Sequence, residues 1–260
     1  MAYGVTDIIY LRSIFDSFRE IKCICDLGLQ EMNCTAGHEY LKEFISACNR
    51  KAEIDISEVI SSFTNGYMDD FWKACGKSYA ALDILGKRDF MFFDLNFDSV
   101  PKELENHFDL VCNAGTTEHI VNQYNGFKTI HDLTRVNGYM YHALPMGGFQ
   151  HHGLFNYNVK FFYSLCTANK YKWIDAYISL GECRVGLDAD IVRALNQDKD
   201  FLPVEQRGLD SIMKNLKATD VGLRIVLKKV KKNFFCAPID LLGAEIEGFE
   251  IGGNGRIYKK

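Results

Sequence analysis

The sequence FDLVCNAGTTEH, residues 108–119, carries the pattern from which we predict the fold of this chain. It opens with the apolar residues Phe108, Leu110 and Val111, a run that is typical of a buried strand. A turn-prone segment containing Gly115 follows and leads into a helical pattern. In open α/β sheets, ligands bind in the crevice beyond the carboxyl ends of the strands, so the stretch predicts a binding site at this turn.

Segments of the same kind lie on both sides of this stretch. Apolar strand patterns alternate with helical patterns along the chain, at residues 22–27, 79–83, 90–94, 139–144, 171–180 and 221–230. Strands that alternate with helices predict a mainly parallel sheet. We expect a single domain over residues 1–260, with a helical insertion or lid at residues 52–78 and a helical cap region at residues 181–218.

Composition and charge exclude several classes of function. The 260 residues carry 30 basic and 34 acidic side chains, a net charge of −4, so nucleic acid is not an expected partner. No apolar run is long enough to span a membrane, and the amino terminus lacks the pattern of a signal peptide. The nine cysteines show no paired CxxC spacing, which indicates reduced core residues in a cytoplasmic protein.

Polar residues and glycines occur at or near the ends of several predicted strands. Each one alone is most often a cap or turn residue, but together they would line one crevice: Asp26 with Gly28, Asp83, Asp94 with Asn96, and Asn113 with Gly115. Carboxylates can accept hydrogen bonds from ribose hydroxyls, and glycine permits close approach of the backbone. The pattern therefore predicts a cofactor that contains a nucleoside.

A dinucleotide-dependent oxidoreductase is the obvious alternative, and the first loop argues against it. Its fingerprint is GxGxxG with an acid about 20 residues further on, which places a pyrophosphate at a helix amino terminus. Here Gly28 stands alone, and Asp83 lies far beyond that distance.

Five motifs taken in order carry a resemblance to a known family. They are CDLGLQE at residues 25–31, ALDI at 81–84, FDLN at 93–96, FDLVCNAGTTEH at 108–119 and GYMYHALP at 138–145. Together they resemble the successive motifs of class I S-adenosylmethionine-dependent methyltransferases. With an HG…NY loop at residues 152–157, the set is most similar to bacterial methyltransferases of surface-polysaccharide (capsule or lipopolysaccharide) and sugar-modification gene clusters, and it spans about residues 20–240.

The resemblance implies a Rossmann-like, seven-stranded, mostly parallel sheet with an antiparallel last strand, flanked by helices. It implies S-adenosylmethionine as the cofactor, with the following residues in its site: Asp26, Gly28 and Gln30 at the methionine part, Asp83 and Ile84 at the ribose, Asp94, Leu95 and Asn96 at the adenine, and Asn113 and Gly115 beneath the sulfonium. The first loop departs from the family pattern, since DLGLQE replaces a form with two or three glycines.

Histidines near the same crevice are the candidate general bases. Methyl transfer to a hydroxyl is an in-line displacement that also requires removal of a proton, and neutral imidazole suits that step. We rank His152 first, because its loop would lie above the methyl group, followed by His142 and His119. A divalent metal held by His142, His151 or His152 with Glu118 is an alternative, but no metal spacing supports it, so no metal is expected.

The sequence therefore predicts a cytoplasmic methyltransferase that acts on oxygen of a sugar, a nucleotide-linked sugar or another carbohydrate-type small molecule. Methylation of a phosphoryl oxygen or an amine of a small metabolite is an alternative within the class. A non-catalytic binding module with the same fold is the alternative outside it. The oligomeric state is open, with a homodimer as one option.

Overall fold

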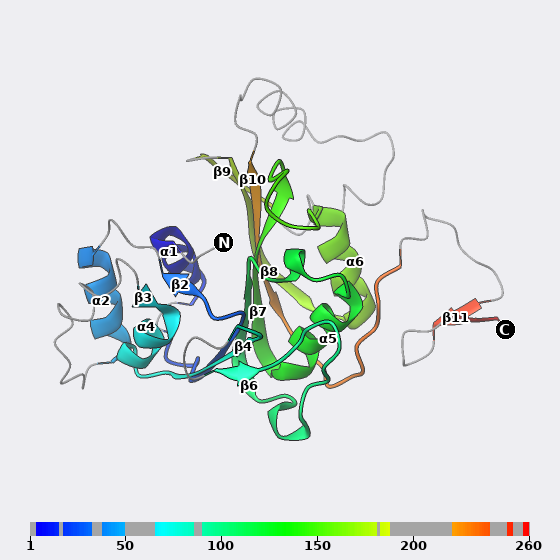
Figure 1. Ribbon diagram of the computed structural model, residues 1–260, viewed down its shortest axis with the longest axis horizontal. Helices are drawn as coiled ribbons and strands as arrows, with labels where there is room; N and C mark the ends of the chain where they lie inside the picture. Colours follow the sequence, from blue (N-terminus) through cyan, green and yellow to red (C-terminus); the bar gives the residue numbers. More distant parts are fainter. Residues whose placement is uncertain are drawn as a thin grey trace. The chain divides into compact units, whose positions relative to one another are not determined.

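The computed structural model describes residues 4–15, 18–32, 38–49, 66–85, 90–180, 183–187, 220–239, 249–251 and 257–259 (Figure 1). Residues 52–65 of the predicted insertion and residues 188–218 of the predicted cap region lie outside these ranges. The chain divides into two compact units, Met1–Met140 and Tyr141–Lys260.

The first unit contains four parallel strands in the order β5-β4-β1-β6. These strands are β5 (Met91–Phe92), β4 (Ser78–Asp83), β1 (Cys23–Leu27) and β6 (Phe108–Ala114). Strand β1 pairs in parallel with β4 on one side and with β6 on the other. All seven residues of β6 are buried, which explains the apolar run that marks this strand in the sequence. The parallel direction brings the carboxyl ends of all four strands to one edge.

In the described part of this unit, four α-helices accompany these strands: α1 (Val5–Ile14), α2 (His38–Cys48), α4 (Met68–Ala74) and α5 (Gln123–Leu133). Helices α1, α2 and α4 lie on one side of the strands and α5 on the other (Figure 1). Helix α5 begins at Asn122, whose side-chain oxygen accepts a hydrogen bond from the backbone N–H of Asn125 at 3.1 Å. Two short 3-10 helices, η2 (Lys102–Leu104) and η3 (Thr117–His119), flank β6.

An aromatic cluster forms the core on the α2 and α4 side of the unit. Trp72 is fully buried and stacks on Phe18, with their ring centroids 5.6 Å apart. Phe71 and Phe44 are stacked with centroids 5.6 Å apart, and both contact Trp72 edge to face. The described part of the predicted insertion thus contributes Trp72 to packing.

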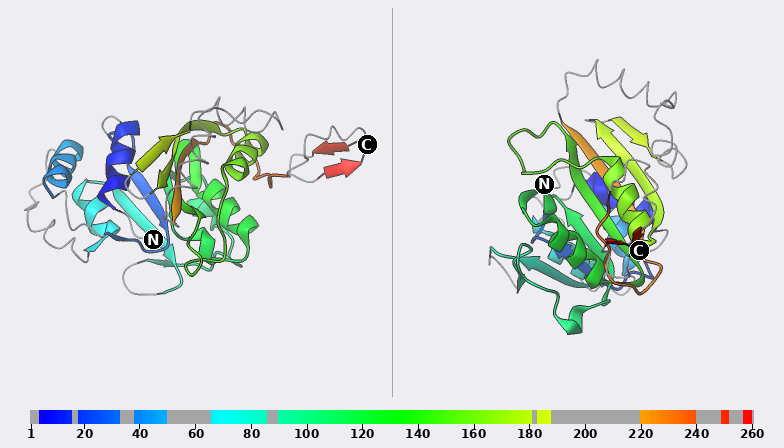
Figure 2. Two further views of the ribbon diagram at one scale, coloured as in Figure 1. Left: turned by 90° about the horizontal axis from the view of Figure 1, so that it is seen from above. Right: turned by 90° about the vertical axis from the view of Figure 1, so that its right-hand side faces the viewer.

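The second unit contains helix α6 (Val159–Asn169) and the strands β8 (Lys172–Leu180), β9 (Cys183–Gly186) and β10 (Val221–Lys228). Helix α6 lies beside β8 and β10 (Figure 2). It begins at Asn158, whose side chain accepts a hydrogen bond from the N–H of Phe161 at 2.8 Å. Strand β8 pairs antiparallel with β10 and with β9. Strands β11 (Phe249–Ile251) and β12 (Ile257–Lys259) form a separate antiparallel pair.

The strands follow one another in the hydrogen-bonded order β5-β4-β1-β6-β7-β10-β8-β9, where β7 (Thr134–Gly147) contains the boundary between the units. The predicted α/β fold, with a mostly parallel sheet and an antiparallel last long strand, is confirmed. The structure adds an eighth strand to the predicted seven, because the start of the region 181–218 forms β9. The remainder of that region, beyond Leu187, is not described.

Two further expectations concern membranes and cysteines. Among the described helices, none has both the length and the apolar character required to cross a bilayer. No disulfide joins the cysteines in the described ranges, and Cys25, Cys75, Cys112 and Cys166 are buried. These four thiols thus behave as core residues.

Candidate functional site

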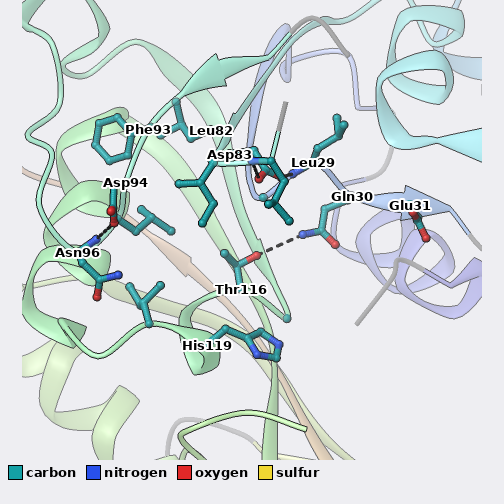
Figure 3. A pocket seen from close by; sticks show the side chains of 16 residues that line it. Leu29, Gln30, Glu31, Leu82, Asp83, Phe93, Asp94, Asn96, Thr116 and His119 are labelled. Atoms are coloured by element: carbon teal, nitrogen blue, oxygen red, sulfur yellow. Dashed lines mark hydrogen bonds between the residues drawn. The ribbon is translucent and has the colours of Figure 1, made fainter. Parts of the chain in front are cut away.

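A pocket of about 620 Å³ lies in the first unit at the carboxyl ends of its parallel strands (Figure 3). Sixteen residues line it, and they come from the end of β4 and from the segments that follow β1, β4, β5 and β6. Eight of the ten predicted cofactor residues are among them: Gly28, Gln30, Asp83, Ile84, Asp94, Leu95, Asn96 and Gly115. The crevice inferred from the strand ends therefore exists within this unit.

The loop after β1 makes a tight turn at Gly28. Gly28 has a φ of +77°, a conformation that L-residues with a side chain rarely adopt. A Cβ atom at this position would lie 2.9 Å from Oγ1 of Thr116. The N–H of Gly28 donates to the carbonyl of Leu82 at 2.7 Å, so the turn is tied to the end of β4. Glycine is therefore required here both by the backbone and by the neighbouring side chain.

Asp83, the last residue of β4, holds two backbone segments with its carboxylate. Oδ2 accepts a hydrogen bond from the N–H of Leu29 at 2.6 Å, and Oδ1 accepts one from the N–H of Leu85 at 2.8 Å. Each carboxylate oxygen has a second lone pair, so further hydroxyl donors can still be accepted. Asp83 is thus rigidly oriented at the pocket wall.

Thr116 and Gln30 connect the β1 loop to the end of β6. The Thr116 hydroxyl donates to the carbonyl of Leu27, and its oxygen accepts from Nε2 of Gln30 at 3.2 Å. The same Gln30 nitrogen donates to the Leu27 carbonyl at 3.1 Å. Figure 3 shows the Gln30 amide directed at Thr116 across the pocket. These bonds hold the loop without the additional glycines of the family pattern.

The far end of the pocket is formed by the segment after β5. Asp94 accepts a hydrogen bond from the N–H of Asn96 at 2.8 Å, which closes a small turn. Oδ1 of Asn96 accepts from the N–H groups of Val121 and Asn122, each at 3.1 Å. The predicted adenine residues are therefore fixed to the segment that precedes α5.

The sequence predicted that Asp26 and Asn113 also line the crevice, but neither residue is among the lining residues. Asp26 is fully buried within β1 and accepts a hydrogen bond from the hydroxyl of Tyr79 at 2.8 Å. Asn113 is fully buried within β6, where it donates to the Thr117 hydroxyl and accepts from the Thr117 N–H. Both residues lie inside strands rather than beyond the strand ends, so their side chains stabilise the sheet and the turn.

His119 is the predicted base that lines this pocket. Its side chain is 44% exposed, and its Nε2 atom lies 3.9 Å from Oε1 of Glu118. Glu118 is fully buried, and this burial raises the pKa of its carboxyl from 4.5 to about 7. The pocket lining thus includes an exposed imidazole, whereas the neighbouring Glu118 carboxyl, whose pKa is raised by burial, is not among the lining residues.

His142 and His152 belong to the second unit. His142 is 1% exposed, and burial lowers the pKa of its imidazole from 6.5 to about 3. His152 lies in an exposed turn, with its ring 5.8 Å from that of Phe149, and desolvation lowers its pKa. That either histidine lies at the pocket of the first unit stays a prediction. The metal alternative also stays a prediction, because it requires Glu118 of the first unit and a histidine of the second.

Charge in the pocket is of one sign. Its described lining residues include three carboxylates, those of Glu31, Asp83 and Asp94, and no lysine or arginine. Such a lining attracts cationic ligands and repels phosphates. The pocket walls are otherwise largely apolar, with Leu82 and Ile120 among them.

Several lining residues were not predicted from the sequence. Thr116 follows directly on Gly115. Its hydroxyl bonds to Gln30 and Leu27, which lie 86 and 89 residues away, so no local sequence pattern indicates that Thr116 lines the pocket. Glu31 is the last residue of the CDLGLQE motif, and its charge at the end of the loop was the available signal. Leu29, Leu85, Phe93 and Ile120 contribute to the walls.

No protein-family model and no curated protein matches the chain. The structure is similar to a SAM-dependent methyltransferase from Archaeoglobus fulgidus, with 11% identity and a TM-score of 0.45, covering 86% of this chain and 94% of that chain.

It is also similar to an O-methyltransferase from a trans-AT PKS multienzyme of Brevibacillus brevis in complex with S-adenosyl-L-homocysteine, with 13% identity, a TM-score of 0.42, and 84% and 71% of the two chains covered. A third similar structure is the 1,6-didemethyltoxoflavin-N1-methyltransferase of Burkholderia thailandensis, with 12% identity, a TM-score of 0.40, and 89% and 92% covered. Likenesses at this level carry no argument about activity, which is therefore argued from the residues of this chain.

Proposed function

We propose that this protein is an S-adenosylmethionine-dependent methyltransferase. The observation that carries the proposal is the composition of the pocket: Asp83 lies in the wall formed by β4, and the described lining has three carboxylates with no lysine or arginine. S-adenosylmethionine carries a sulfonium and an ammonium group, and both favour such a lining.

The same composition argues against a dinucleotide or another phosphate-containing cofactor. A pyrophosphate requires cationic side chains or a cradle of backbone N–H groups. The loop after β1 has Gly28 as its one glycine, and the N–H groups of Gly28 and Leu29 already donate to Leu82 and Asp83. The described loop thus offers little to a phosphate.

The order of the strands agrees with the placement that the sequence resemblance implies for the cofactor. Asp94, Leu95 and Asn96 would border the adenine at the β5 end, Asp83 and Ile84 would bind the ribose, and the loop at Gly28 and Gln30 would hold the methionine part. Gly115 would lie beneath the sulfonium. The lining fits S-adenosylmethionine, because the hydroxyl and ammonium groups of the cofactor are hydrogen-bond donors and the carboxylates of the lining are acceptors.

The protein's own contribution to the reaction is alignment and removal of a proton. When bound, the sulfonium supplies an electrophilic methyl group. The fixed carboxylate of Asp83 and the Gln30–Thr116 contact would orient the bound molecule, which is the main requirement of an in-line displacement. His119, which lines the pocket, and His152 are the proposed general bases. His142, with a pKa of about 3, is a poor proton acceptor at pH 7.

We propose oxygen of a sugar, a nucleotide-linked sugar or a related surface-polysaccharide precursor as the acceptor, and the cytoplasm as the location. The support for this is the sequence resemblance and the histidine bases, which suit a hydroxyl acceptor. A phosphoryl oxygen or an amine of a small metabolite is the second candidate. A non-catalytic module is disfavoured, because the pocket retains Asp83 and an open volume of about 620 Å³.

Transfer of an isotope-labelled methyl group from S-adenosylmethionine to a panel of sugar nucleotides, free sugars, phosphorylated metabolites and amines tests the proposal. We expect labelled product with a sugar hydroxyl acceptor and release of S-adenosylhomocysteine. Once an acceptor is found, His119→Asn and His152→Asn identify the base, with the exposed His107→Asn as the matched control. Label in amines alone would replace the oxygen acceptor, and binding without transfer to any acceptor would favour the non-catalytic module.

A further inference from the structure

Two cysteines of the first unit, Cys48 and Cys75, lie at the ends of neighbouring helices. Cys48 is the last residue of α2, and Cys75 follows directly on α4. One helical turn earlier on each helix, the rings of Phe44 and Phe71 are stacked with their centroids 5.6 Å apart. Residues four positions apart lie on the same face of a helix, so the contact between the two helices continues from the phenylalanine pair to the cysteine pair.

Further contacts join the same two helix ends. Nδ2 of Asn49 donates a hydrogen bond to the carbonyl of Ala74 at 3.1 Å. A Cβ atom at Gly76 would lie 3.3 Å from Cγ and Nδ2 of Asn49. The residue after Cys48 thus contacts the residues on both sides of Cys75. The two thiols themselves meet, because the Cys75 thiol donates a hydrogen bond to the Cys48 sulfur.

The start of α4 is also fixed. Helix α4 follows the short strand β3 (Gly66–Tyr67), which pairs antiparallel with β2 (Glu31–Met32). The N–H of Met68, the first residue of α4, donates to the carbonyl of Gln30 at 3.0 Å. Hydrogen bonds at both ends of α4 therefore hold Cys75 in place beside α2.

The two thiols differ in exposure and in their electrostatic surroundings. Cys48 is half-buried, whereas Cys75 is 1% exposed. The hydrogen bond from Cys75 lowers the pKa of the Cys48 thiol, although partial burial opposes this shift. The positive charges of Lys77 and Arg12 also lower it. Burial raises the pKa of the Cys75 thiol well above its ordinary value. An accessible thiolate thus lies beside a thiol that keeps its proton.

We propose that Cys48 and Cys75 are a modification site, a thiol pair that hydroperoxides oxidise to an intramolecular disulfide. The Cys48 thiolate attacks one peroxide oxygen: an S–O bond forms, the O–O bond breaks, and the other oxygen takes a proton from solvent and leaves as water or an alcohol. The Cys75 sulfur then attacks the sulfenic acid of Cys48. The S–S bond forms, the S–O bond breaks, and the oxygen leaves with the Cys75 proton as water.

The two thiols lose two electrons in this sequence, and the hydroperoxide accepts them. Cys48 is therefore the attacking cysteine and Cys75 the resolving one, in accord with their exposure. The inference is independent of the ligand that the pocket binds.

Peptide mapping of the full chain after treatment with hydrogen peroxide tests the proposal. Free thiols are blocked, and the protein is digested with trypsin without reduction. Cleavage yields the peptides 43–50 and 74–77, which contain one cysteine each, Cys48 and Cys75. We expect these two peptides as the main disulfide-linked pair in the mass spectrum. The same treatment in urea should lower the yield of this pair about 10-fold or more, because the unfolded chain no longer holds the two thiols together.

Variants assign the two roles. In Cys75→Ser, the sulfenic acid of Cys48 has no resolving partner and should be trapped by dimedone, whereas the wild type should trap little. In Cys48→Ser, Cys75 should stay reduced. Cys23→Ser, at a half-buried cysteine of β1, is the matched control and should form as much cross-link as the wild type.

Three results would overturn the proposal. The first is oxidised wild-type protein in which both thiols stay free or are linked to other cysteines. The second is an equal yield of the linked pair in urea, which would show that the fold does not position the thiols. The third is dimedone on Cys75 in the Cys48→Ser variant with none on Cys48 in Cys75→Ser. The first two need no variant, so they stand even if a substitution at the buried Cys75 prevents folding.

Discussion

The Asp83 carboxylate and the Leu29 N–H are joined by a 2.6 Å hydrogen bond that spans 54 residues of sequence. It connects the end of β4 to the loop after β1, and the second oxygen of Asp83 accepts from the Leu85 N–H. A single side chain therefore shapes the pocket wall and presents its remaining lone pairs to a ligand. In the proposed function the same side chain also binds the ribose, so that the pocket's shape and ligand binding would depend on one residue.

Asp83→Asn removes the charge and one oxygen acceptor of the side chain and keeps its size and shape. An amide has one oxygen acceptor, so the variant can accept from only one of the Leu29 and Leu85 N–H groups and directs an NH2 group at the other. We expect a loss in unfolding free energy of about 1–2 kcal/mol and in affinity for S-adenosylhomocysteine of about 10-fold or more. Chemical denaturation and calorimetry measure both. Asp175→Asn, at an exposed position of β8, should change neither.

Gly28→Ala tests the contact between the β1 loop and Thr116. The new Cβ would lie 2.9 Å from Oγ1 of Thr116 at a backbone φ of +77°. We expect destabilisation of about 1–2 kcal/mol from the backbone alone, and displacement of the loop with weaker binding of S-adenosylhomocysteine. The control is Gly186→Ala, because a Cβ atom at that position would meet no described atom within 4 Å.

A double-mutant cycle with Thr116→Ala separates the two causes of the destabilisation by Gly28→Ala, the positive φ and the contact with Thr116. Removing the hydroxyl relieves the short contact but leaves the strained φ, so Gly28→Ala should cost less in the Thr116→Ala background than in the wild type. Strictly additive unfolding free energies would show that Thr116 does not constrain the glycine.

Trp72→Leu tests whether the predicted insertion packs the core or covers a ligand. Trp72 is fully buried against Phe18, Phe44 and Phe71, so the smaller side chain should cost about 2–4 kcal/mol of unfolding free energy. At temperatures at which the variant is still folded, its affinity for S-adenosylhomocysteine should stay within about 2-fold of the wild-type affinity. Phe97→Ala, at a side chain that is 84% exposed, should cost under about 0.5 kcal/mol. A large loss of affinity with little loss of stability would instead support a lid.

His142 predicts a pH dependence of stability. Burial lowers its pKa from 6.5 to about 3, so its neutral form stabilises the fold above pH 6.5, and this stability is lost as the pH falls toward 3. The His142→Gln variant should be less stable than the wild type at pH 7.5, and this difference should narrow by about 2–3 kcal/mol at pH 4.5. Urea denaturation at both pH values measures it. A difference that stays constant would contradict the burial account, and the exposed His107→Gln should show no narrowing.

The sequence predicted the strands and most of the pocket because these depend on local patterns. Apolar runs mark β1, β4 and β6, and the residues directly beyond a run, such as Gly28 and Gly115, fall at the sheet edge. The same reasoning did not distinguish Asp26 and Asn113, which are not among the residues that line the pocket. Asp26 pairs with Ala81 and Cys112 on its two sides, so it lies within the sheet, and a polar residue near a strand end does not reveal this.

The remainder of the site depends on contacts between distant segments. The Thr116 hydroxyl acts on Leu27 and Gln30, and the pairing of Glu31 with Tyr67 forms only in the folded chain. The same holds for pKa values: His142 resembles any other histidine in the sequence, and only its burial makes it a weak base. Long-range packing of this kind has no signature in a single sequence.

Calorimetric titration of the wild-type protein with S-adenosylmethionine, S-adenosylhomocysteine and NAD tests whether the pocket binds S-adenosylmethionine. The carboxylate-lined pocket predicts micromolar binding of the first two ligands and no heat with NAD. Binding of NAD, or the absence of binding by both sulfur nucleosides, would contradict the assignment of this pocket to S-adenosylmethionine.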